Sequence, residues 1–274
     1  MRITFTILLP TYKSQFLREC VDSIIAQTYP NWELLIVDDA SPEPIEQIVK
    51  TYDDARICYY RNAQNYGAKR LVDQWNYCLS LAKGDYVICM GDDDMLLPQC
   101  LETYAKLIEQ HPDIAVLHGQ TQIIDEKGEV VHQLAPRPKW ESAITMLYHR
   151  TFSRRAQFIG DFCFRRKELL AKGGFFYLPY AWGSDDISAL QVAEEQGVIN
   201  TQEVVFAYRD NAGSITRHAH TAGKLHAVWL ETLWKWRFLH RPATSEQEES
   251  YRRQLKHHLL SHTLRKCYYI IRNV

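Results

Sequence analysis

Short apolar runs alternate with segments of helical period along the first 110 residues of the chain. The helical pattern is clear after Ser14, a residue suited to cap a first turn, because Leu17, Val21 and Ile24 then repeat on one face. Strands that alternate with helices predict a mostly parallel, doubly wound α/β sheet. The predicted strands are 3–9, 32–37, 57–61 and 85–90, and the predicted helices are 14–27, 45–51, 68–82 and 98–110.

The pattern changes after residue 113. Two strands at 114–124 and 129–133 are expected to be joined by a turn at 125–128. The remaining predicted elements are a helix at 184–196, a strand at 203–208, and two helices at 224–239 and 246–271 separated by Pro242. The chain is therefore expected to end in a helical extension of the α/β fold.

Composition and charge narrow the class of protein. Hydrophobic residues are 46% and charged residues 24% of the 274 residues, and a formal net charge of -1 excludes a polycation that binds nucleic acid. The seven cysteines form no C-x-x-C pair, so we expect buried thiols in a reducing compartment. The first apolar run ends at Pro10, and no run reaches the roughly 20 residues of a membrane span. We therefore expect a cytoplasmic protein with at most a surface association with membrane.

Polar clusters follow three of the predicted strands. They lie at residues 10–12 (Pro-Thr-Tyr), 38–39 (Asp-Asp) and 92–94 (Asp-Asp-Asp). The carboxyl ends of neighbouring parallel strands meet at one edge of a sheet, and ligands bind in the crevice there. We therefore expect the three clusters to converge on one pocket.

Asp92, Asp93 and Asp94 are adjacent carboxylates that repel one another unless water or a cation neutralises them. A purely structural role would be an acidic turn before a helix, where Asp is favoured. A chemical role would be a site for Mg²⁺ or Mn²⁺, which bind one or two carboxylates together with phosphate oxygens. The buried strand before the triplet and the other clusters at the same edge favour the metal site.

Asp38 and Asp39 can be interpreted in two ways. They could form a turn that caps the next helix, or accept hydrogen bonds from a base N–H or from ribose hydroxyls. Neither the G-x-G-x-x-G fingerprint nor the G-x-x-x-x-G-K-[ST] loop occurs in the chain. A nucleotide would therefore have to be held by carboxylates, a metal and basic side chains.

In combination, the motifs between residues 3 and 110 resemble the family 2 glycosyltransferases, which have the GT-A fold. The resemblance rests on Pro10-Thr11-Tyr12, Gln27-Thr28-Tyr29, residues 33–41, Asn65-Tyr66-Gly67, Arg70, Asn76, residues 82–86 and residues 92–98. The last of these stands where the family has its metal-binding D-x-D-like motif. Gly91 is a departure, because many members carry another acid there, so the metal is assigned to the three aspartates alone.

The resemblance implies a Rossmann-like, mostly parallel sheet flanked by helices. It implies a GT-A domain at 1–215, with a nucleotide-binding half at 1–112 and an acceptor half at 113–215, and a helical C-terminal extension at 216–274. The implied reaction is an inverting, metal-dependent transfer of a sugar from a nucleoside diphosphate, expected to be UDP, to a hydroxyl of a glycan or lipid-linked acceptor. Its expected setting is the biosynthesis of a cell-surface polysaccharide.

The resemblance also assigns roles to single residues. Thr11, Tyr12 and Asp39 would contact the nucleoside, and Arg70 would lie near the base or the phosphates. The full set expected to bind the nucleotide-sugar is Pro10, Thr11, Tyr12, Asp38, Asp39, Asn65, Arg70, Asp92 and Asp93. Asp93 and Asp94 are the expected ligands of Mn²⁺ or Mg²⁺, which would stabilise the charge on the leaving diphosphate.

An inverting transfer also needs a base for the proton of the acceptor hydroxyl. Residues 182–186 resemble the family's E/D-D motif at the start of a helix, where its base is found, although Asp185 replaces the common Glu and shortens the reach. The structural alternative is capping by Ser184 followed by acids in the first turn. We assign the base to Asp185 and Asp186 and favour Asp185.

The segment after the last predicted strand departs from the family. A histidine is common where this chain has Asn211, with a nearby serine that Ser214 could match, so Asn211 is not a predicted metal ligand. His218 or His220 could replace that histidine, but a solvated loop histidine is the favoured interpretation.

The end of the chain is basic, with six Lys or Arg and no acid from residue 251 to 274. Its predicted helix has an apolar stripe formed by Leu255, Leu259, Leu260, Leu264, Tyr268 and Ile271. The favoured interpretation is a helix docked on the domain with a solvated basic face. The alternatives are contact with anionic lipid or a lipid-linked acceptor, and dimerisation.

Two other functions fit parts of the sequence. A binding module of the same fold without turnover is favoured only by the departures at Gly91 and Asn211, and the acid pair at 185–186 argues against it. A nucleotidyltransferase would also use paired carboxylates. It would need an early glycine-rich loop with a basic residue that grips a triphosphate, and no such loop follows the first predicted strand.

Overall fold

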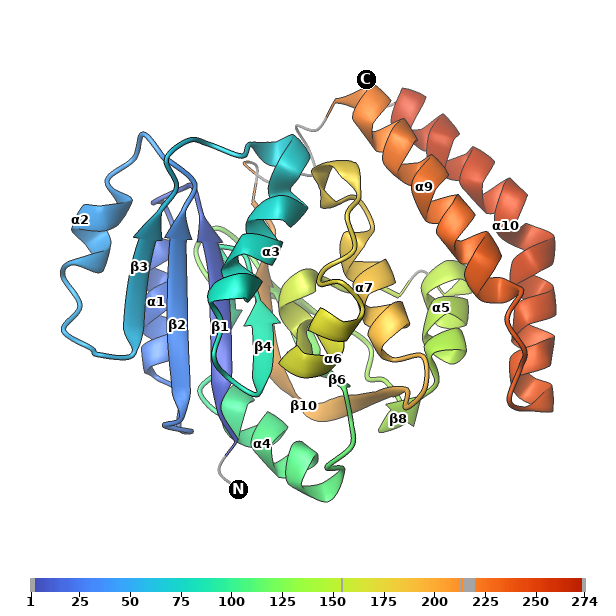
Figure 1. The fold of residues 1–274 in the computed structure, drawn as a ribbon, viewed down its shortest axis with the longest axis horizontal. Coiled ribbons are helices and arrows are strands. Elements are labelled where there is room, and N and C mark those ends of the chain that lie inside the picture. Colours follow the sequence, from blue (N-terminus) through green and yellow to red (C-terminus); the bar gives the residue numbers. More distant parts are fainter. Residues whose placement is uncertain (1–2, 154, 212, 214–219, 273–274) are drawn as a thin grey trace.

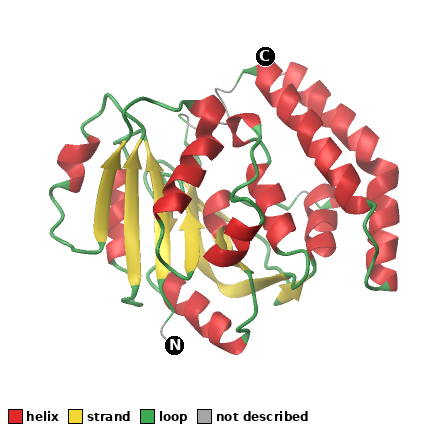
Figure 2. Cartoon of the chain, viewed as in Figure 1, coloured by secondary structure: helices red, strands yellow, loops and turns green. Residues whose placement is uncertain are grey.

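The structure, a computed structural model, describes residues 3–153, 155–211, 213 and 220–272. A curled sheet lies between layers of helices, and two long helices lie side by side at one end of the molecule (Figure 1). The layers are distinct when strands and helices are coloured separately (Figure 2). The predicted fold class, a mostly parallel sheet flanked by helices with a helical C-terminal extension, is confirmed.

The first half of the chain places its strand tips at one edge. Strands β1, β2, β3 and β4 are mutually parallel and adjacent in the order β3-β2-β1-β4. Thr11 at the end of β1 is in register with Asp38 at the end of β2. The elements are β1 (Phe5–Thr11), α1 (Leu17–Ile25), β2 (Trp32–Asp38), α2 (Ile45–Val49), β3 (Ile57–Arg61), the 3₁₀ turn η1 (Ala68–Arg70), α3 (Leu71–Leu81) and β4 (Tyr86–Cys89).

The second half extends the sheet with β9, β6, β10 and β5, with β7 paired to β6 and β8 to β10. Strand β9 runs antiparallel to both β4 and β6, whereas β6 and β10 are parallel. The elements are β5 (Met95–Leu96), α4 (Cys100–Gln110), β6 (Val116–Ile124), β7 (Val130–Gln133), β8 (Trp140–Glu141), α5 (Ala143–Phe152), η2 (Ile159–Asp161), β9 (Phe162–Arg165), α6 (Arg166–Ala171), η3 (Pro179–Ala181), α7 (Ser184–Val192), β10 (Val198–Arg209), α9 (Thr221–Leu239) and α10 (Glu246–Arg272).

Two predicted helix starts are wrong. Helix α1 begins at Leu17 after Phe16, and Ser14 does not cap it. The backbone N–H groups of Tyr12 and Lys13 donate to Asp92, and that of Ser14 donates to Glu43, so this stretch is bound to other elements before the helix can begin. Helix α4 begins at Cys100, two residues beyond Pro98.

The sheet is buried on both faces. Alternate residues of β1 belong to different cores, with Leu8 in one and Ile7 and Leu9 in the other. This is the two-residue period of a strand covered by helices on both sides. Helices α1 and α4 contribute to the core of Ile7 and Leu9, and α3, α5 and α7 contribute to the core of Leu8.

The C-terminal helices join the core of Leu8 through Phe238, Leu239 and Leu255. The apolar stripe predicted on the last helix is divided. Leu255 is buried and Leu259 partly buried, whereas Leu260, Leu264, Tyr268 and Ile271 are exposed. Helix α10 thus has a docked apolar face and a second apolar face in solvent.

All seven cysteines are free thiols, and five of them are buried, as predicted. Burial raises the pKa of Cys78 and Cys100 well above the usual range, so these thiols stay protonated and unreactive. Within the described ranges, no helix combines the length and the apolar character needed to cross a bilayer.

We predict that Phe238→Ala lowers the free energy of unfolding by about 3–5 kcal/mol, because a buried ring is removed. The Phe238 ring stacks on Trp234 at 5.0 Å, the Arg252 guanidinium lies 5.3 Å from it, and its carbonyl accepts a hydrogen bond from Arg252. Urea denaturation measures the loss. Trp236→Ala, an exposed aromatic on the same helix, is the control. Equal effects for the two variants would mean that the helix pair is not docked through Phe238.

Candidate active site

The acidic turn after β4 is bound directly to the end of β1. One carboxylate oxygen of Asp92, Oδ2, accepts hydrogen bonds from the backbone N–H of Tyr12 at 2.8 Å and of Lys13 at 2.9 Å. The backbone N–H of Asp39 donates to the carbonyl of Thr11 at 2.9 Å. The three strand-end clusters therefore lie along one edge of the sheet.

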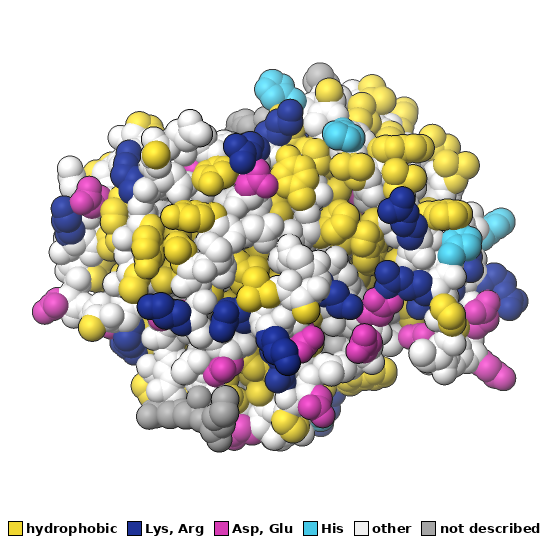
Figure 3. Space-filling view, in the orientation of Figure 1, with side chains coloured by type: hydrophobic (Ala, Val, Ile, Leu, Met, Phe, Trp, Pro, Cys, Tyr) yellow, Lys and Arg dark blue, Asp and Glu magenta, His cyan; other side chains and the backbone are white. Residues whose placement is uncertain are grey.

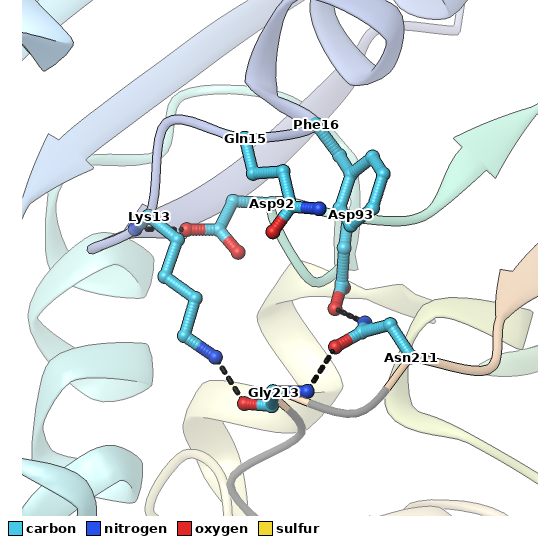
Figure 4. Close-up of a pocket in the computed structure, with 7 residues that line it drawn as sticks. All are labelled: Lys13, Gln15, Phe16, Asp92, Asp93, Asn211 and Gly213. Carbon is cyan, nitrogen blue, oxygen red and sulfur yellow. Dashed lines mark hydrogen bonds between the residues drawn. The ribbon is translucent and has the colours of Figure 1, made fainter. Parts of the chain in front are cut away.

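A cavity of about 160 Å³ opens at this edge (Figure 4). Its lining combines two carboxylates with one amine and two amides: Lys13, Gln15, Phe16, Asp92, Asp93, Asn211 and Gly213. Lys13 Nζ donates to the carbonyl of Gly213, and Asn211 Nδ2 donates to Asp93 Oδ2 at 2.6 Å. Residues some 200 positions apart in the sequence thus line one polar cavity.

Burial and mutual repulsion raise the pKa of two acids in the turn after β4. Burial, followed by the charge of Asp93, raises the pKa of Asp92 to about 6. The same two causes raise the pKa of Asp94 well above its usual range. Asp94 Oδ1 accepts the backbone N–H of Arg209 at 3.0 Å, and Asp94 does not line the cavity. Two of the three predicted carboxylates therefore face the cavity, and the third is buried and does not line it.

The presence of glycine at position 91 has a steric explanation in this chain. A Cβ at this position would lie 2.6 Å from Asp93 Oδ1 and 3.2 Å from Asp94 Oδ2. Carbon–oxygen contacts of 2.6 Å are well inside van der Waals distance. An acid at position 91 would therefore displace the carboxylates of Asp93 and Asp94 from their present positions.

Arg209, at the end of β10, holds the acidic turn in place. Its side chain is fully buried and donates to the carbonyl of Asp93 at 2.8 Å and to the carboxylate of Glu19 at 2.6 Å. It also donates to the carbonyl of Asp125 at 3.0 Å, and its guanidinium lies 4.3 Å from the Phe16 ring. One cation thus connects the ends of β4, β6 and β10 to helix α1.

The two aspartates after β2 have different environments. Asp38 is fully buried, and its carboxylate accepts hydrogen bonds from the Ser41 N–H, the Tyr59 hydroxyl and Arg61, which accounts for its conformation without a ligand. Asp39 accepts hydrogen bonds from Asn62 and from backbone N–H groups of the segment that contains Asn65. Asp39 therefore fixes this segment at the carboxyl edge of the sheet, where it forms the rim of the site.

The other predicted nucleotide contacts also lie along this edge. Thr11 is buried and donates its hydroxyl to the carbonyl of Leu9, whereas Tyr12 is exposed and Pro10 half-buried. Asn65 is exposed. The Arg70 guanidinium lies 4.8 Å from the Tyr66 ring and pairs with Asp73. Tyr12, Asn65 and Arg70 thus present ring and polar groups to solvent beside the buried acids.

Asn211 donates a hydrogen bond to the acidic turn. Its amide nitrogen faces Asp93, and its amide oxygen accepts the N–H of Gly213 at 2.9 Å. Both ends of the amide are thus occupied by hydrogen bonds within the chain. His220 is exposed, and Ser214 and His218 lie outside the described residues.

The carboxylate oxygens at the cavity are ligands that suit a hard divalent cation. Asp92 and Asp93 supply two carboxylates next to open space, and Mg²⁺ or Mn²⁺ commonly uses one or two protein carboxylates, with substrate phosphates completing the shell. Among the residues that the structure describes, no three His, Cys, Asp or Glu side chains form a complete metal cage. A cation at this site would therefore need oxygens from water or substrate.

The second acidic cluster begins helix α7, with Asp185 and Asp186 in its first turn. Asp186 is buried, and both of its carboxylate oxygens accept hydrogen bonds from Arg150 Nε at 3.1 Å. Its Oδ1 also accepts a hydrogen bond from Gln157 Nε2 at 2.6 Å. Burial alone would raise the pKa of Asp186, but the charges of Arg150 and Lys235 hold it below its usual range.

Asp185 has the opposite environment. Burial, followed by the negative charge of Asp186, raises the pKa of Asp185 to about 7, with Arg150 opposing the shift. No side chain of the described residues donates a hydrogen bond to its carboxylate. Two neighbouring acids therefore differ in protonation, and Asp185 is the one that can exchange a proton near neutral pH.

The C-terminal helices also pack next to the segment that carries Asp185 and Asp186. A Cβ at Gly183 would lie 3.4 Å from the carboxylate carbon of Glu231 on α9. Glu231 is buried and accepts hydrogen bonds from Lys235 and from Lys266 of α10. Burial would raise the pKa of Glu231, but the two lysines outweigh it and hold the pKa below its usual range. The charge environment of Asp185 and Asp186 thus includes the extension.

Several of these residues were missed by sequence reasoning. Lys13, adjacent to Tyr12 and close in space to Asp92, was detectable as a base next to a predicted acidic pocket. Arg209, Arg150 and Gln157 gave no signal, because their partners lie 115, 36 and 29 residues away.

The family model described as Glycosyl transferase family 2 matches residues 6–174, which is more than half of the chain. The chain belongs to this family and carries its glycosyltransferase domain. WcaA of Escherichia coli, whose name assigns it to colanic acid biosynthesis, is 32% identical over 159 residues, 57% of this chain and 54% of WcaA. The chain spans about half the length of the first curated relatives that it matches.

Solved structures share the GT-A fold at low sequence identity. The TarS 1–349 complex of Staphylococcus aureus with UDP-GlcNAc has a TM-score of 0.70 at 17% identity and covers 91% of this chain and 70% of its own. A mannosyltransferase of Pyrobaculum calidifontis in complex with GDP-Man and Mn²⁺ has a TM-score of 0.64 at 16% identity and covers 100% of this chain and 74% of its own. The match to the mannosyltransferase therefore includes the C-terminal helices.

We predict that Arg209→Met lowers the free energy of unfolding by about 3–5 kcal/mol, because it leaves the carbonyls of Asp93 and Asp125 without their buried donor and Glu19 without its partner. Urea denaturation at pH 7 measures the loss. Lys50→Met, which removes an exposed cation at the end of α2 that pairs with Glu46, serves as the control and should change little. A loss no larger than that of the control would contradict the role of Arg209 as the centre of the turn.

Proposed function

We propose that the chain transfers a sugar from a nucleoside-diphosphate donor to a hydroxyl of a glycan or lipid-linked acceptor. The observation that carries the proposal is the cavity at the carboxyl edge, where Asp92 and Asp93 face open space beside Lys13. Two carboxylates that can hold a divalent cation, next to a positively charged amine, are suited to binding a diphosphate. UDP is the proposed carrier, supported by the UDP-GlcNAc complex of the TarS neighbour, with GDP as the alternative from the mannosyltransferase neighbour.

The nucleoside would lie along the rim formed by Tyr12, Asp39, Asn65 and Arg70, with Thr11 and Pro10 supporting it. The diphosphate would lie at the cavity, within reach of Lys13. Asp92 and Asp93 would hold Mn²⁺ or Mg²⁺, and the buried Asp94 would support them. When bound, the cation supplies charge neutralisation to the leaving diphosphate.

The proposed transfer is a single displacement that inverts the anomeric carbon. The acceptor oxygen forms a bond to that carbon as the bond to the diphosphate oxygen breaks, and the hydroxyl proton passes to Asp185. Asp185 suits this role because its pKa is raised to about 7, whereas Asp186 is held ionised by Arg150 and Gln157. The products are a glycoside and a nucleoside diphosphate.

The proposed setting is cell-surface polysaccharide biosynthesis at the cytoplasmic face of a membrane. The relationship to WcaA supports the polysaccharide, and the basic end of the chain supports an acceptor on a lipid carrier. The proposed domain division keeps a nucleotide-binding half at 1–112, an acceptor half at 113–215 and the helical extension at 216–274.

Donor binding provides the first test. We expect one or more members of a panel of nucleotide-sugars to bind more tightly with Mn²⁺ than without it, as measured by calorimetry. Asp93→Ala should weaken this metal-dependent binding by about a hundredfold, because it removes a carboxylate from the cavity. Asp113→Ala, an exposed acid before β6 at the opposite edge of the sheet, is the matched control. The proposal fails if no donor binds and Asp93→Ala leaves Mn²⁺ affinity unchanged.

The acid pair provides the second test. Asp185→Asn should keep donor binding and lower kcat by roughly 10²–10⁴-fold, because the proton acceptor is lost. In the native chain, kcat should rise with pH up to about 7 and then level off, because Asp185 must be ionised to accept the proton. Asp186→Asn should retain part of the activity and shift this profile to lower pH, since the negative charge that raises the pKa of Asp185 is gone.

Two other outcomes have definite meanings. If Asp186→Asn abolishes transfer and Asp185→Asn only shifts the pH profile, the base is Asp186. If the native chain binds donor with Mn²⁺ but releases no nucleoside diphosphate with any acceptor, the chain is a binding module of the same fold.

A further inference from the structure

Helix α9 exposes an apolar face to solvent. Trp229 is 59% exposed and Trp236 53%, and Leu233 lies between them on the same face. The spacing of four and three residues places these side chains in one stripe. The outer face of a helix in a globular protein normally carries charged residues. This stripe therefore has a function other than packing within the chain.

Helix α10 exposes a second stripe at the same level. Leu260, Leu264, Tyr268 and Ile271 are each about 60–70% exposed, and they recur at helical spacing. Thr232 of α9 is hydrogen-bonded to Thr263 of α10 at 2.8 Å, so the stripes lie level along the antiparallel pair. Hydrophobic side chains gather over this part of the molecule (Figure 3). We call these seven residues the helix-pair surface.

Basic side chains flank the helix-pair surface. Arg237, Lys256, Arg265 and Arg272 are exposed, and none has an acidic partner among the residues that the structure describes. The acids Glu246, Glu248 and Glu249 are confined to the first turn of α10, no Asp or Glu occurs from residue 250 to 272, and Glu231 of α9 is buried against Lys235 and Lys266. Beyond the first turn of α10, the apolar stripes therefore lie within a basic rim.

We propose that the helix-pair surface binds the surface of a membrane that contains anionic lipid. Tryptophan and tyrosine prefer the interface between lipid and water, leucine and isoleucine side chains enter the acyl boundary, and Lys and Arg attract anionic headgroups. Trp229, Trp236 and Tyr268 supply the first kind of contact. Two parallel stripes bury more apolar area in the interface than the last helix would alone.

The charge of the rim distinguishes a membrane from a second copy of the chain. A two-fold dimer through this surface would bring each patch against its own copy. The basic rims would then meet with no acid between 250 and 272 to neutralise them. An anionic lipid surface supplies the missing negative charge, so the membrane is the better complement.

The position of α9 relates this surface to the candidate active site. The inner side of α9 places Glu231 beside Gly183, directly before Asp185 and Asp186. Its outer side carries Trp229, Leu233 and Trp236. A chain bound through the helix-pair surface would thus hold its acid pair one helix away from lipid, close to where a lipid-linked hydroxyl would arrive.

Vesicle binding tests the proposal with the full chain and without donor or acceptor. We expect the chain to sediment with vesicles of phosphatidylglycerol and phosphatidylcholine at least tenfold more strongly than with phosphatidylcholine alone, and 0.5 M salt should weaken this binding. Brominated lipid should quench its tryptophan fluorescence. Arg265→Glu/Arg272→Glu should lower binding to anionic vesicles by at least tenfold, since each basic residue near the headgroups contributes about fivefold.

Trp229→Ala/Trp236→Ala should also lower binding by about tenfold and remove most of the quenching by brominated lipid. The matched control is Val131→Ala/Lys172→Glu, which changes an exposed apolar and an exposed basic residue elsewhere. Circular dichroism should show unchanged folding for every variant. Equal binding to neutral and anionic vesicles, or variants that bind like the native chain, would overturn the proposal.

A dimer by light scattering that Trp229→Ala/Trp236→Ala dissociates, without preference for anionic vesicles, would assign the surface to a second copy instead. Because no step measures sugar transfer, a negative result with vesicles would leave the transferase proposal standing.

Discussion

The repulsion between three consecutive carboxylates is the constraint on which this edge of the sheet depends. Asp92 is held by two backbone N–H groups from the end of β1, and Arg209 donates to the carbonyl of Asp93 and, through its N–H, to the carboxylate of Asp94. Because β10 supplies Arg209, the acidic turn of the first half is held in place by the second half of the chain. The cation also contacts the Phe16 ring just before α1 and pairs with Glu19 on α1, so one side chain links the acidic turn to the start of that helix.

The alternation of apolar runs and helical segments predicted much of the sheet, since each central strand is buried on both faces and helices such as α1 and α4 have one apolar face against it. Of the short antiparallel strands, β7 was predicted together with the turn before it, whereas β5, β8 and β9 could not be predicted in this way. Strand β9 has four residues, and its place between β4 and β6 comes from pairing with segments far away in the sequence. Strands β5 and β8 have two residues each and are likewise defined by pairing with β10, not by any local period.

The candidate site shows the same division between local and distant information. Strand-end clusters at 10–12, 38–39 and 92–94 could be recognised because parallel strands end at a common edge. The sequence could not distinguish Asp38, whose carboxylate is occupied by Ser41, Tyr59 and Arg61, from Asp92 and Asp93, which face the cavity. Nor could it separate Asp185 from Asp186, because their difference arises from Arg150 and Gln157.

The C-terminal helices do more than extend the fold, because their buried charges lie among those that set the protonation of the acid pair. Lys235 lowers the pKa of Asp186, and an ionised Asp186 raises the pKa of its neighbour Asp185. Displacement of α9 would remove Lys235 from this group and leave Arg150 as the main cation beside the two acids. A contact on the outer face of α9 therefore has a physical route to the proposed base, through a buried charge network that ends at Glu231 and Lys266 on the helix pair.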